Sequence, residues 1–294
     1  MVTPASRRHR CAALESVVPV PLRAASLRRR LDALYLHYDH RFVDPDPLQF
    51  ARAQAAPEDQ EVVGLVAAAL AYGNVKQIKR SIQAALEILG PRPARALRRL
   101  DPRRTARALE PFRHRFNTGR DVACLFFLLR QMLEGWGSVQ AFFAQGLQAD
   151  AGHVGPALAS FCARALALDC AGLYGRGALP PGARVRFFFP SPVDGSACKR
   201  LNLYLRWMVR REGVDLGLWR DVDPAALIIP LDAHIITLGK RLGLTQRTSP
   251  GWPMALEITE SLRRLDPRDP VKYDFALHRM GLWKKEAEIR SLER

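Results

Sequence analysis

The chain has 294 residues, and its content of 25% charged and 48% hydrophobic residues excludes an intrinsically disordered protein. This length is enough to bury a full core, either in one large domain or in two lobes. The formal net charge of +16 makes a polyanion the first partner to consider, although a biased codon supply is a second source of arginine enrichment.

Apolar residues recur every three or four positions along most of the chain, which predicts a nearly all-α fold. We expect a disordered basic tail at residues 1–22 and a folded unit at 23–294, and the composition of the tail also fits a transit peptide. Residues 169–185, with repeated Gly and a Pro-Pro pair, are the best candidate for a loop between lobes. The predicted helices are 27–38, 57–70, 75–89, 94–100, 105–109, 119–134, 139–147, 156–168, 197–211, 233–242, 252–265 and 271–280.

Five scattered cysteines, with no CxxC pair, argue against a zinc or iron–sulfur site. Unpaired cysteines and the lack of a secretory leader predict an intracellular, cytoplasmic protein. The longest apolar stretch, residues 62–72, is too short to span a bilayer, so no membrane partner is expected.

Lysine is the scarce cation of this chain, with seven copies among the 45 Lys and Arg residues. Lys199 follows a predicted turn and opens a helix for which Ser196 is the expected N-cap, and Asp232 is the expected N-cap of the helix at 233–242. A lysine made partly neutral by the helix dipole and by burial can attack a sugar C1′ atom. A nearby carboxylate can stabilise the positive charge that develops on the sugar. The pair therefore suggests cleavage of a glycosidic bond in DNA.

The same residues allow simpler interpretations. A lysine at a helix start is more often a phosphate contact, and an aspartate before a helix is more often only a cap. The turn at Gly195 and Ser196 could bind a DNA phosphate through backbone N–H groups. On the helix that follows, Arg206 and Arg210 share a face with the lysine, and this face is expected to add phosphate contacts.

Two motifs resemble the helix-hairpin-helix DNA glycosylases. The segment Leu231-Asp-Ala-His-Ile235, followed by Arg241-Leu-Gly-Leu244, is similar to their catalytic-aspartate helix and matches Asp232 to that aspartate. Gly195-Ser-Ala-Cys-Lys199 resembles the Gly-x-Gly-x-Lys hairpin of the bifunctional members, with Ala197 in place of the second glycine. The long gap between Lys199 and Asp232 is similar to the archaeal 8-oxoguanine glycosylase branch.

More closely, residues 24–284 resemble an uncharacterised bacterial family related to these enzymes, on segments that include 69–78, 116–121, 195–203 and 270–275. The resemblance implies a two-lobed helical glycosylase-like fold with its hairpin and catalytic region at 187–244, and DNA and a flipped base in the cleft. It implies that Tyr72, Asn74 and Gln77 face the lesion, although a turn and a helix cap are an equally good interpretation of Asn74.

The resulting hypothesis is a base excision repair enzyme, a DNA glycosylase with AP lyase activity. Lys199 would form a Schiff base, and Asp232 would stabilise the sugar cation and assist proton transfer. Arg200, Arg206 and Arg210 would bind phosphates. The expected partner is double-stranded DNA with a damaged base such as 8-oxoguanine, bound by a monomer in the bacterial nucleoid. No metal or cofactor is implied, apart from a monovalent cation held by hairpin carbonyls. Two alternatives stay open: a non-catalytic module for damaged DNA or structured RNA, and a monofunctional glycosylase in which Asp232 activates water.

Overall fold

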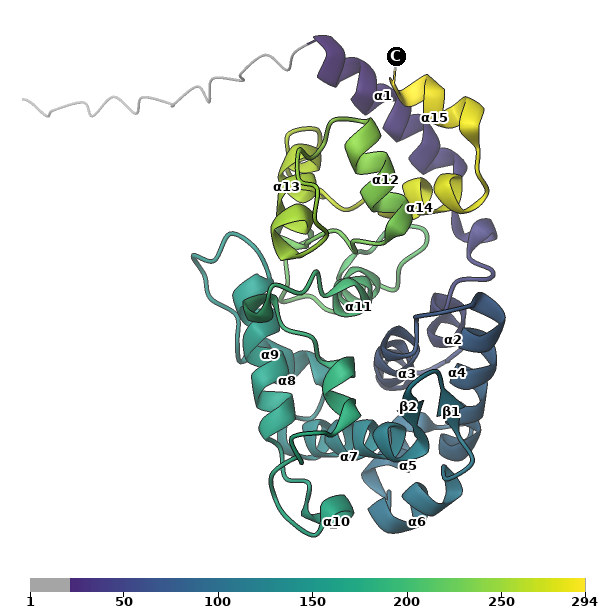
Figure 1. Cartoon of the computed structure of the whole chain (residues 1–294), viewed down its shortest axis with the longest axis vertical. Helices are drawn as coiled ribbons and strands as arrows, with labels where there is room; N and C mark the ends of the chain where they lie inside the picture. Colours follow the sequence, from purple (N-terminus) through teal and green to yellow (C-terminus); the bar gives the residue numbers. More distant parts are fainter. Residues whose placement is uncertain (1–21, 294) are drawn as a thin grey trace, which may run out of the picture.

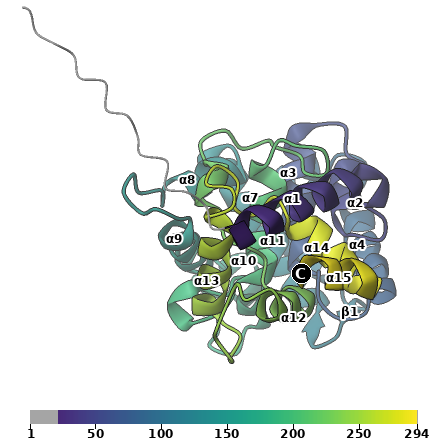
Figure 2. The ribbon, with the colours of Figure 1, turned by 90° about the horizontal axis from the view of Figure 1, so that it is seen from above.

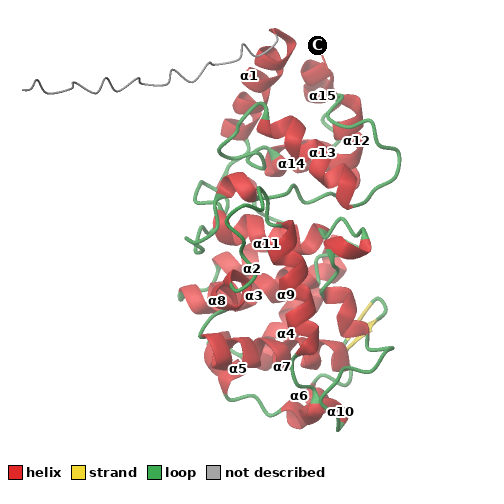
Figure 3. Cartoon of the chain, turned by 90° about the vertical axis from the view of Figure 1, so that its left-hand side faces the viewer, coloured by secondary structure: helices red, strands yellow, loops and turns green. Residues whose placement is uncertain are grey.

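The computed structural model describes residues 22–293, and helices make up most of this part of the chain (Figure 1, Figure 3). The predicted basic tail lies outside the described residues except for Leu22, where the first helix begins. The α-helices are α1 (Leu22–His37), α2 (Leu48–Arg52), α3 (Pro57–Ala69), α4 (Val75–Leu89), α5 (Pro93–Arg98), α6 (Pro102–Ala108), α7 (Gly119–Trp136), α8 (Val139–Ala144), α9 (Gly155–Ala167), α10 (Ala171–Tyr174), α11 (Lys199–Val209), α12 (Ala233–Arg241), α13 (Trp252–Arg263), α14 (Asp274–Leu282) and α15 (Glu286–Glu293). The prediction of a mostly helical protein is confirmed.

The helices form two groups with α11 between them (Figure 1). The upper group contains α1 and α12 to α15, and the lower group contains α2 to α10. Helix α1 packs against α14 and α15, so the two ends of the described chain lie together at the top of the molecule, as the view from above also shows (Figure 2). The N-terminal helix and the C-terminal helices therefore build one group, and the middle of the chain builds the other.

The lower group is organised around α7, which packs against α5, α6 and α8. A capping box starts this helix, because the Thr118 side chain accepts from the backbone of Asp121 and the Asp121 carboxylate accepts from the Thr118 N–H at 2.7 Å. The helix then runs through an apolar segment, residues 122–129, whose side chains are all buried. An all-round apolar helix of this kind belongs in the centre of a helical layer.

Helix α11 is held from both groups. On the lower side it packs against α3 at Gly64, where an added Cβ atom would lie 2.7 Å from Met208 Cε. The Tyr204 hydroxyl donates to the Glu61 carbonyl of α3 at 3.2 Å. On the upper side Arg206 forms an ion pair with Asp274 of α14. The glycine permits the close approach that sets where the N-terminus of α11 lies.

Several sequence predictions need correction. The first helix begins at Leu22 rather than after Ser26, and α14 begins at Asp274 rather than at residue 271. The segment 169–185 does not join the two groups, because its α10 packs against α6 at the far end of the lower group (Figure 1). Short elements that carry too little periodicity were not predicted: α2, α15, the antiparallel strands β1 (Arg113–His114) and β2 (Asn117–Thr118), and the 3-10 helices η1 (His40–Phe42), η2 (Arg184–Phe188), η3 (Pro192–Asp194) and η4 (Pro224–Ala226).

Candidate active site

A cavity of about 280 Å³ lies between the two groups of helices, and both Lys199 and Asp232 line it. Its walls come from five parts of the chain, namely 45–47, 71–78, the first two turns of α11, 230–234 and 274–282. Small-molecule sites commonly measure about 300–1,000 Å³, so this cavity is at the lower end of that range. The two residues that the sequence singled out, 33 positions apart, are thus brought to one cavity.

Lys199 is the first residue of α11 and is half-buried. The turn before it is tight, since Gly195 has φ 73° and Cys198 has φ 48°, both in the left-handed region. Ser196 is not the N-cap that we predicted, because its hydroxyl accepts from the Cys198 N–H at 3.2 Å, one residue before the helix. Among residues 22–293 the Lys199 amine has no ion-pair partner within 4.0 Å, which leaves it available to a ligand in the cavity.

Asp232 is the N-cap of α12, as predicted, and accepts from the Ile235 N–H at 2.8 Å through Oδ1. Its second oxygen, Oδ2, lies 2.6 Å from His278 Nδ1 of α14. Burial raises the pKa of Asp232, but the hydrogen bond and charge of His278, with a further contribution from the charge of Lys199, outweigh it and lower the pKa to about 2. Asp232 is therefore an anion at neutral pH.

His278 is a site residue that the sequence analysis missed. It lies 46 positions after Asp232, in a helix that was predicted for its apolar periodicity alone. Gly281, one turn later, allows α14 to approach α12 closely, since an added Cβ atom there would lie 2.8 Å from His234 Cβ. The His234 and His278 rings meet edge to face at 5.4 Å. Burial lowers the pKa of His234, which favours its neutral form.

The inner wall of the cavity contains a buried ion pair between Arg206 and Asp274. Burial and the negative charge of Asp232, opposed by the charge of Arg206, together raise the pKa of Asp274 to about 6. The same Arg206 also pairs with Asp215 at 3.2 Å. The wall is thus polar but internally paired.

Of the three residues predicted to face a lesion, the structure places one at the cavity. Tyr72 lines it, and its hydroxyl donates to Asn117 Oδ1 and to the His114 carbonyl. Asn74 is the N-cap of α4, with Oδ1 accepting from the Lys76 N–H at 2.9 Å. Gln77 is exposed, outside the cavity wall, and donates to Ser81 at 3.1 Å. The cap interpretation of Asn74 holds, and the cavity role of Asn74 and Gln77 needs correction.

The predicted phosphate contacts of three arginines also need correction, because all three are buried. The Arg200 guanidinium donates to the Ala69 and Phe187 carbonyls and lies 3.8 Å from the Phe187 ring centre. Arg206 and Arg210 both pair with Asp215, and Arg210 also pairs with Asp269 at 2.9 Å. Their helical periodicity was correct, but the face that they share is covered by the carboxylates of Asp215, Asp269 and Asp274.

The hairpin itself stays near the surface. Gly195 is exposed and Ser196 is half-buried, so both are placed where a phosphate could reach them. The Gly195 carbonyl, one of the hairpin carbonyls expected above to hold a monovalent cation, accepts from the Trp252 N–H at 3.0 Å. This bond ties the hairpin to the start of α13.

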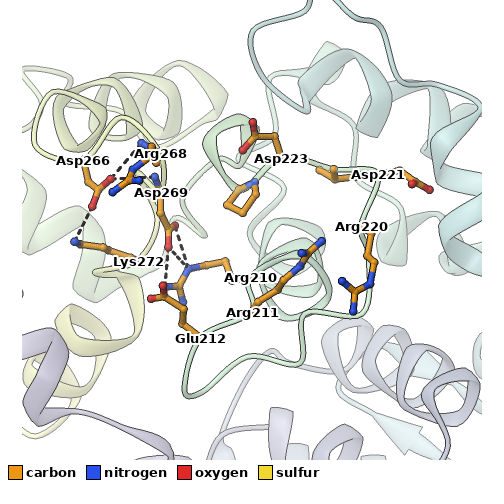
Figure 4. A pocket seen from close by; sticks show the side chains of 12 residues that line it. Arg210, Arg211, Glu212, Arg220, Asp221, Asp223, Asp266, Arg268, Asp269 and Lys272 are labelled. Atoms are coloured by element: carbon orange, nitrogen blue, oxygen red, sulfur yellow. Dashed lines mark hydrogen bonds and ion pairs between the residues drawn. The ribbon is translucent and has the colours of Figure 1, made fainter.

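A second recess, of about 750 Å³, lies beyond the C-terminal end of α11 (Figure 4). Five cations and five carboxylates line it, so its charges balance. Several of these groups are paired to each other, including Lys272 with Asp266 at 2.7 Å and Arg210 with Asp269 (Figure 4). A recess lined by balanced and paired charges is not expected to select an anion.

No group of three or more His, Cys, Asp or Glu side chains that could hold a metal ion occurs within residues 22–293. In the same part of the chain, no helix has the length and apolar character needed to cross a membrane.

Fold and site together define a mostly helical protein with a lysine and an ionised aspartate in a cavity between two groups of helices. A family model described as "Protein of unknown function (DUF2400)" matches residues 46–283. Because this match spans well over half of the chain, the protein belongs to that family. The matched region contains Lys199, Asp232 and His278. No curated protein and no solved structure matches the chain.

Proposed function

We propose that this protein is a DNA repair glycosylase with associated lyase activity, in which Lys199 is the nucleophile and Asp232 stabilises the sugar cation. The observation that carries the proposal is that both side chains line one cavity. There Asp232 is an anion, and Lys199 has no ion pair among the described residues. The two-group helical architecture and the η3–α11 hairpin support a helix-hairpin-helix glycosylase-like fold.

The proposed reaction begins with attack of the neutral Lys199 amine on C1′ of the damaged nucleotide. A bond forms between Nζ and C1′, the bond between C1′ and the base nitrogen breaks, and the base leaves with the bonding electron pair and takes up a proton. Positive charge develops on the sugar as this bond breaks, and the Asp232 carboxylate stabilises it. Ring opening then gives a Schiff base, from which loss of the 2′ proton expels the 3′ phosphate.

The pKa of Asp232 supports this assignment over the monofunctional alternative. A carboxylate with a pKa of about 2 is a weak base and removes a proton from water poorly at neutral pH. The same low pKa keeps the carboxylate charged, which is what stabilisation of a cation requires. Asp232 therefore fits the role of an electrostatic partner better than the role of a general base.

The proposed substrate is double-stranded DNA with an extruded base, for which an oxidised purine such as 8-oxoguanine is the first candidate. The charge of +16 supports a polyanionic partner, and action on bacterial DNA would place the protein in the nucleoid. We propose that it acts as a monomer. We further propose that it needs no metal or organic cofactor, because the amine and the carboxylate supply the chemistry.

A borohydride trapping experiment tests the proposal. The protein is incubated with duplexes that carry 8-oxoguanine, other oxidised or alkylated bases, uracil or an abasic site, with borohydride present. We expect a covalent protein–DNA adduct with at least one substrate and none with Lys199→Ala. Free base without an adduct would favour the monofunctional enzyme, and binding without either product would favour the non-catalytic module.

A further inference from the structure

Three aromatic rings cluster beside the cavity, and two of them are unusually exposed. Phe116, at the tip of the β1–β2 hairpin, is 42% exposed, and Phe187 of η2 is 37% exposed. Their ring centres lie 4.5 Å apart in an edge-to-face arrangement, and Tyr72 lies 4.8 Å from Phe187 and 5.6 Å from Phe116. Tyr72 also lines the cavity, so the cluster continues the cavity wall to the surface.

The exposed rings are held firmly from below. Arg200 stacks on Phe187 at 3.8 Å, and its guanidinium donates to the Phe187 carbonyl. Arg184 donates to the Phe116 carbonyl at 2.6 Å, and Asn117 donates back to the Arg184 carbonyl at 3.2 Å. These bonds join the hairpin to η2. The two exposed rings are therefore held in fixed positions. An apolar side chain that is exposed without a function would not need such support.

The β1–β2 hairpin is also anchored to the turn between α3 and α4. Arg115 has φ 53°, in the left-handed region, and its side chain lies against Gly73, where an added Cβ atom would be 3.0 Å from Arg115 Cδ. Gly73 itself has φ 98° and lines the cavity. A strained tip held in one position beside a cavity is more often functional than structural.

Exposed basic side chains flank the two exposed rings. Arg115 and Arg186 precede the two rings in the chain, and Arg184 donates to the Phe116 carbonyl. All three are exposed and make no ion pair with the described residues. Exposed rings next to unpaired cations are the combination that binds single-stranded or unpaired nucleotides, because bases stack on the rings while phosphates meet the cations. A protein partner with an acidic surface would form ion pairs with the cations but would have no group to stack on the exposed rings.

We propose that the exposed rings of Phe116 and Phe187 hold an unpaired base beside the cavity. Because the two rings are nearly perpendicular, at 81°, the base would stack on the face of one ring and meet the edge of the other. The proposal rests on the proposed function only in taking DNA as the partner, since stacking requires no chemistry at Lys199. In this proposal the two rings keep a nucleotide unpaired beside the cavity. The proposal also assigns a role to the segment 116–121, which has no role in the catalytic assignment.

Binding of the full chain to duplex DNA with one bulged 2-aminopurine, compared with the fully paired duplex, tests this proposal. For Phe116→Ala we expect affinity for the bulged duplex to fall about tenfold, with a much smaller change for the paired duplex, and the quenching of 2-aminopurine fluorescence to be lost. Phe116→Trp should keep the affinity for the bulged duplex and the quenching. Trp136→Ala, which removes a ring with 39% exposure in α7, is the matched control and should change neither.

The outcomes separate this proposal from the proposed function. Equal effects of Phe116→Ala and Trp136→Ala would overturn the stacking proposal and leave the glycosylase assignment untouched. Loss of stacking in Phe116→Ala without any base release by the wild-type protein would support the stacking proposal and overturn the glycosylase. If the wild-type protein bound neither duplex, both proposals would fail.

Discussion

The two ends of helix α11 use the same kind of residue in opposite ways. At its N-terminus Lys199 lines a cavity and has no ion-pair partner within residues 22–293. At its C-terminus Arg206 and Arg210 are 2% exposed and pair with three carboxylates. A cation with several buried partners stabilises the fold, whereas a cation without a partner beside a cavity is free to act on a ligand. Charge alone does not distinguish the two.

Replacing the unpaired cation should have the largest effect. In Lys199→Ala we expect loss of the covalent adduct and a fall in base release of at least about a thousandfold, because the nucleophile is removed. The free energy of unfolding should change little, since the amine has no partner to lose. Single-turnover assays and chemical denaturation measure the two quantities. A variant that still released base at the wild-type rate would remove Lys199 from the mechanism.

The carboxylate partner should rank second. Asp232→Asn keeps an N-cap of similar strength for α12 but removes the negative charge from the cavity. We expect base release to slow by about a hundredfold to a thousandfold, with helix stability nearly unchanged. Asp232→Ala is the control for the cap, and it should lose about 1 kcal/mol of stability in addition.

The C-terminal end of α11 predicts a stability effect. Arg210→Met leaves Asp215 and Asp269 without this partner, and we expect the free energy of unfolding to fall by about 3–5 kcal/mol. Arg211→Met, at the exposed neighbouring position, should change it by less than about 0.5 kcal/mol. Urea unfolding followed by circular dichroism measures both. If instead Arg210→Met were stable and bound DNA weakly, Arg210 would be a phosphate contact after all.

The smallest effect concerns pH. Loss of His278 removes the hydrogen bond that lowers the pKa of Asp232, while burial continues to raise it, so the pKa must rise in His278→Ala. Since the active form of Asp232 is the anion, base release should then fall at a higher pH on the acid side than in the wild-type protein.

His278→Gln retains a hydrogen-bond donor, so the acid limb of its base release should lie between those of the wild-type protein and His278→Ala. Near neutral pH the rate of base release should fall about tenfold at most. A pH–rate profile for the three proteins measures this shift. Identical acid limbs would show that His278 does not set the charge of Asp232.

The sequence predicted the helices around the site well where periodicity and a cap agreed. Helix α4 has the predicted bounds, with Asn74 as N-cap and Gly90 as C-cap, and Asp232 caps α12 as expected. The predicted start was also wrong where a short side chain could serve two roles, as at Ser196, whose hydroxyl closes a turn instead of capping α11. Local rules thus placed Lys199 and Asp232 at helix starts correctly.

What the sequence could not supply was tertiary contact. The one feature near His278 that fits a close approach of α14 to α12 is Gly281, and a glycine does not show which helix it meets. The burial of Arg206 and Arg210 depends on Asp215, which follows the helix closely, and on Asp269 and Asp274, which are about 60 or more positions away in the chain. Helical periodicity shows which residues share a face, but the partner that covers the face is set by packing.

The central claim is tested most directly by identifying the residue that carries the borohydride-trapped sugar. Digestion of the adduct and peptide mass spectrometry should place the reduced deoxyribose remnant on Lys199 and on no other lysine of the chain. An adduct on a different amine, or base release with no adduct on any peptide, would contradict the assignment of Lys199 as the nucleophile.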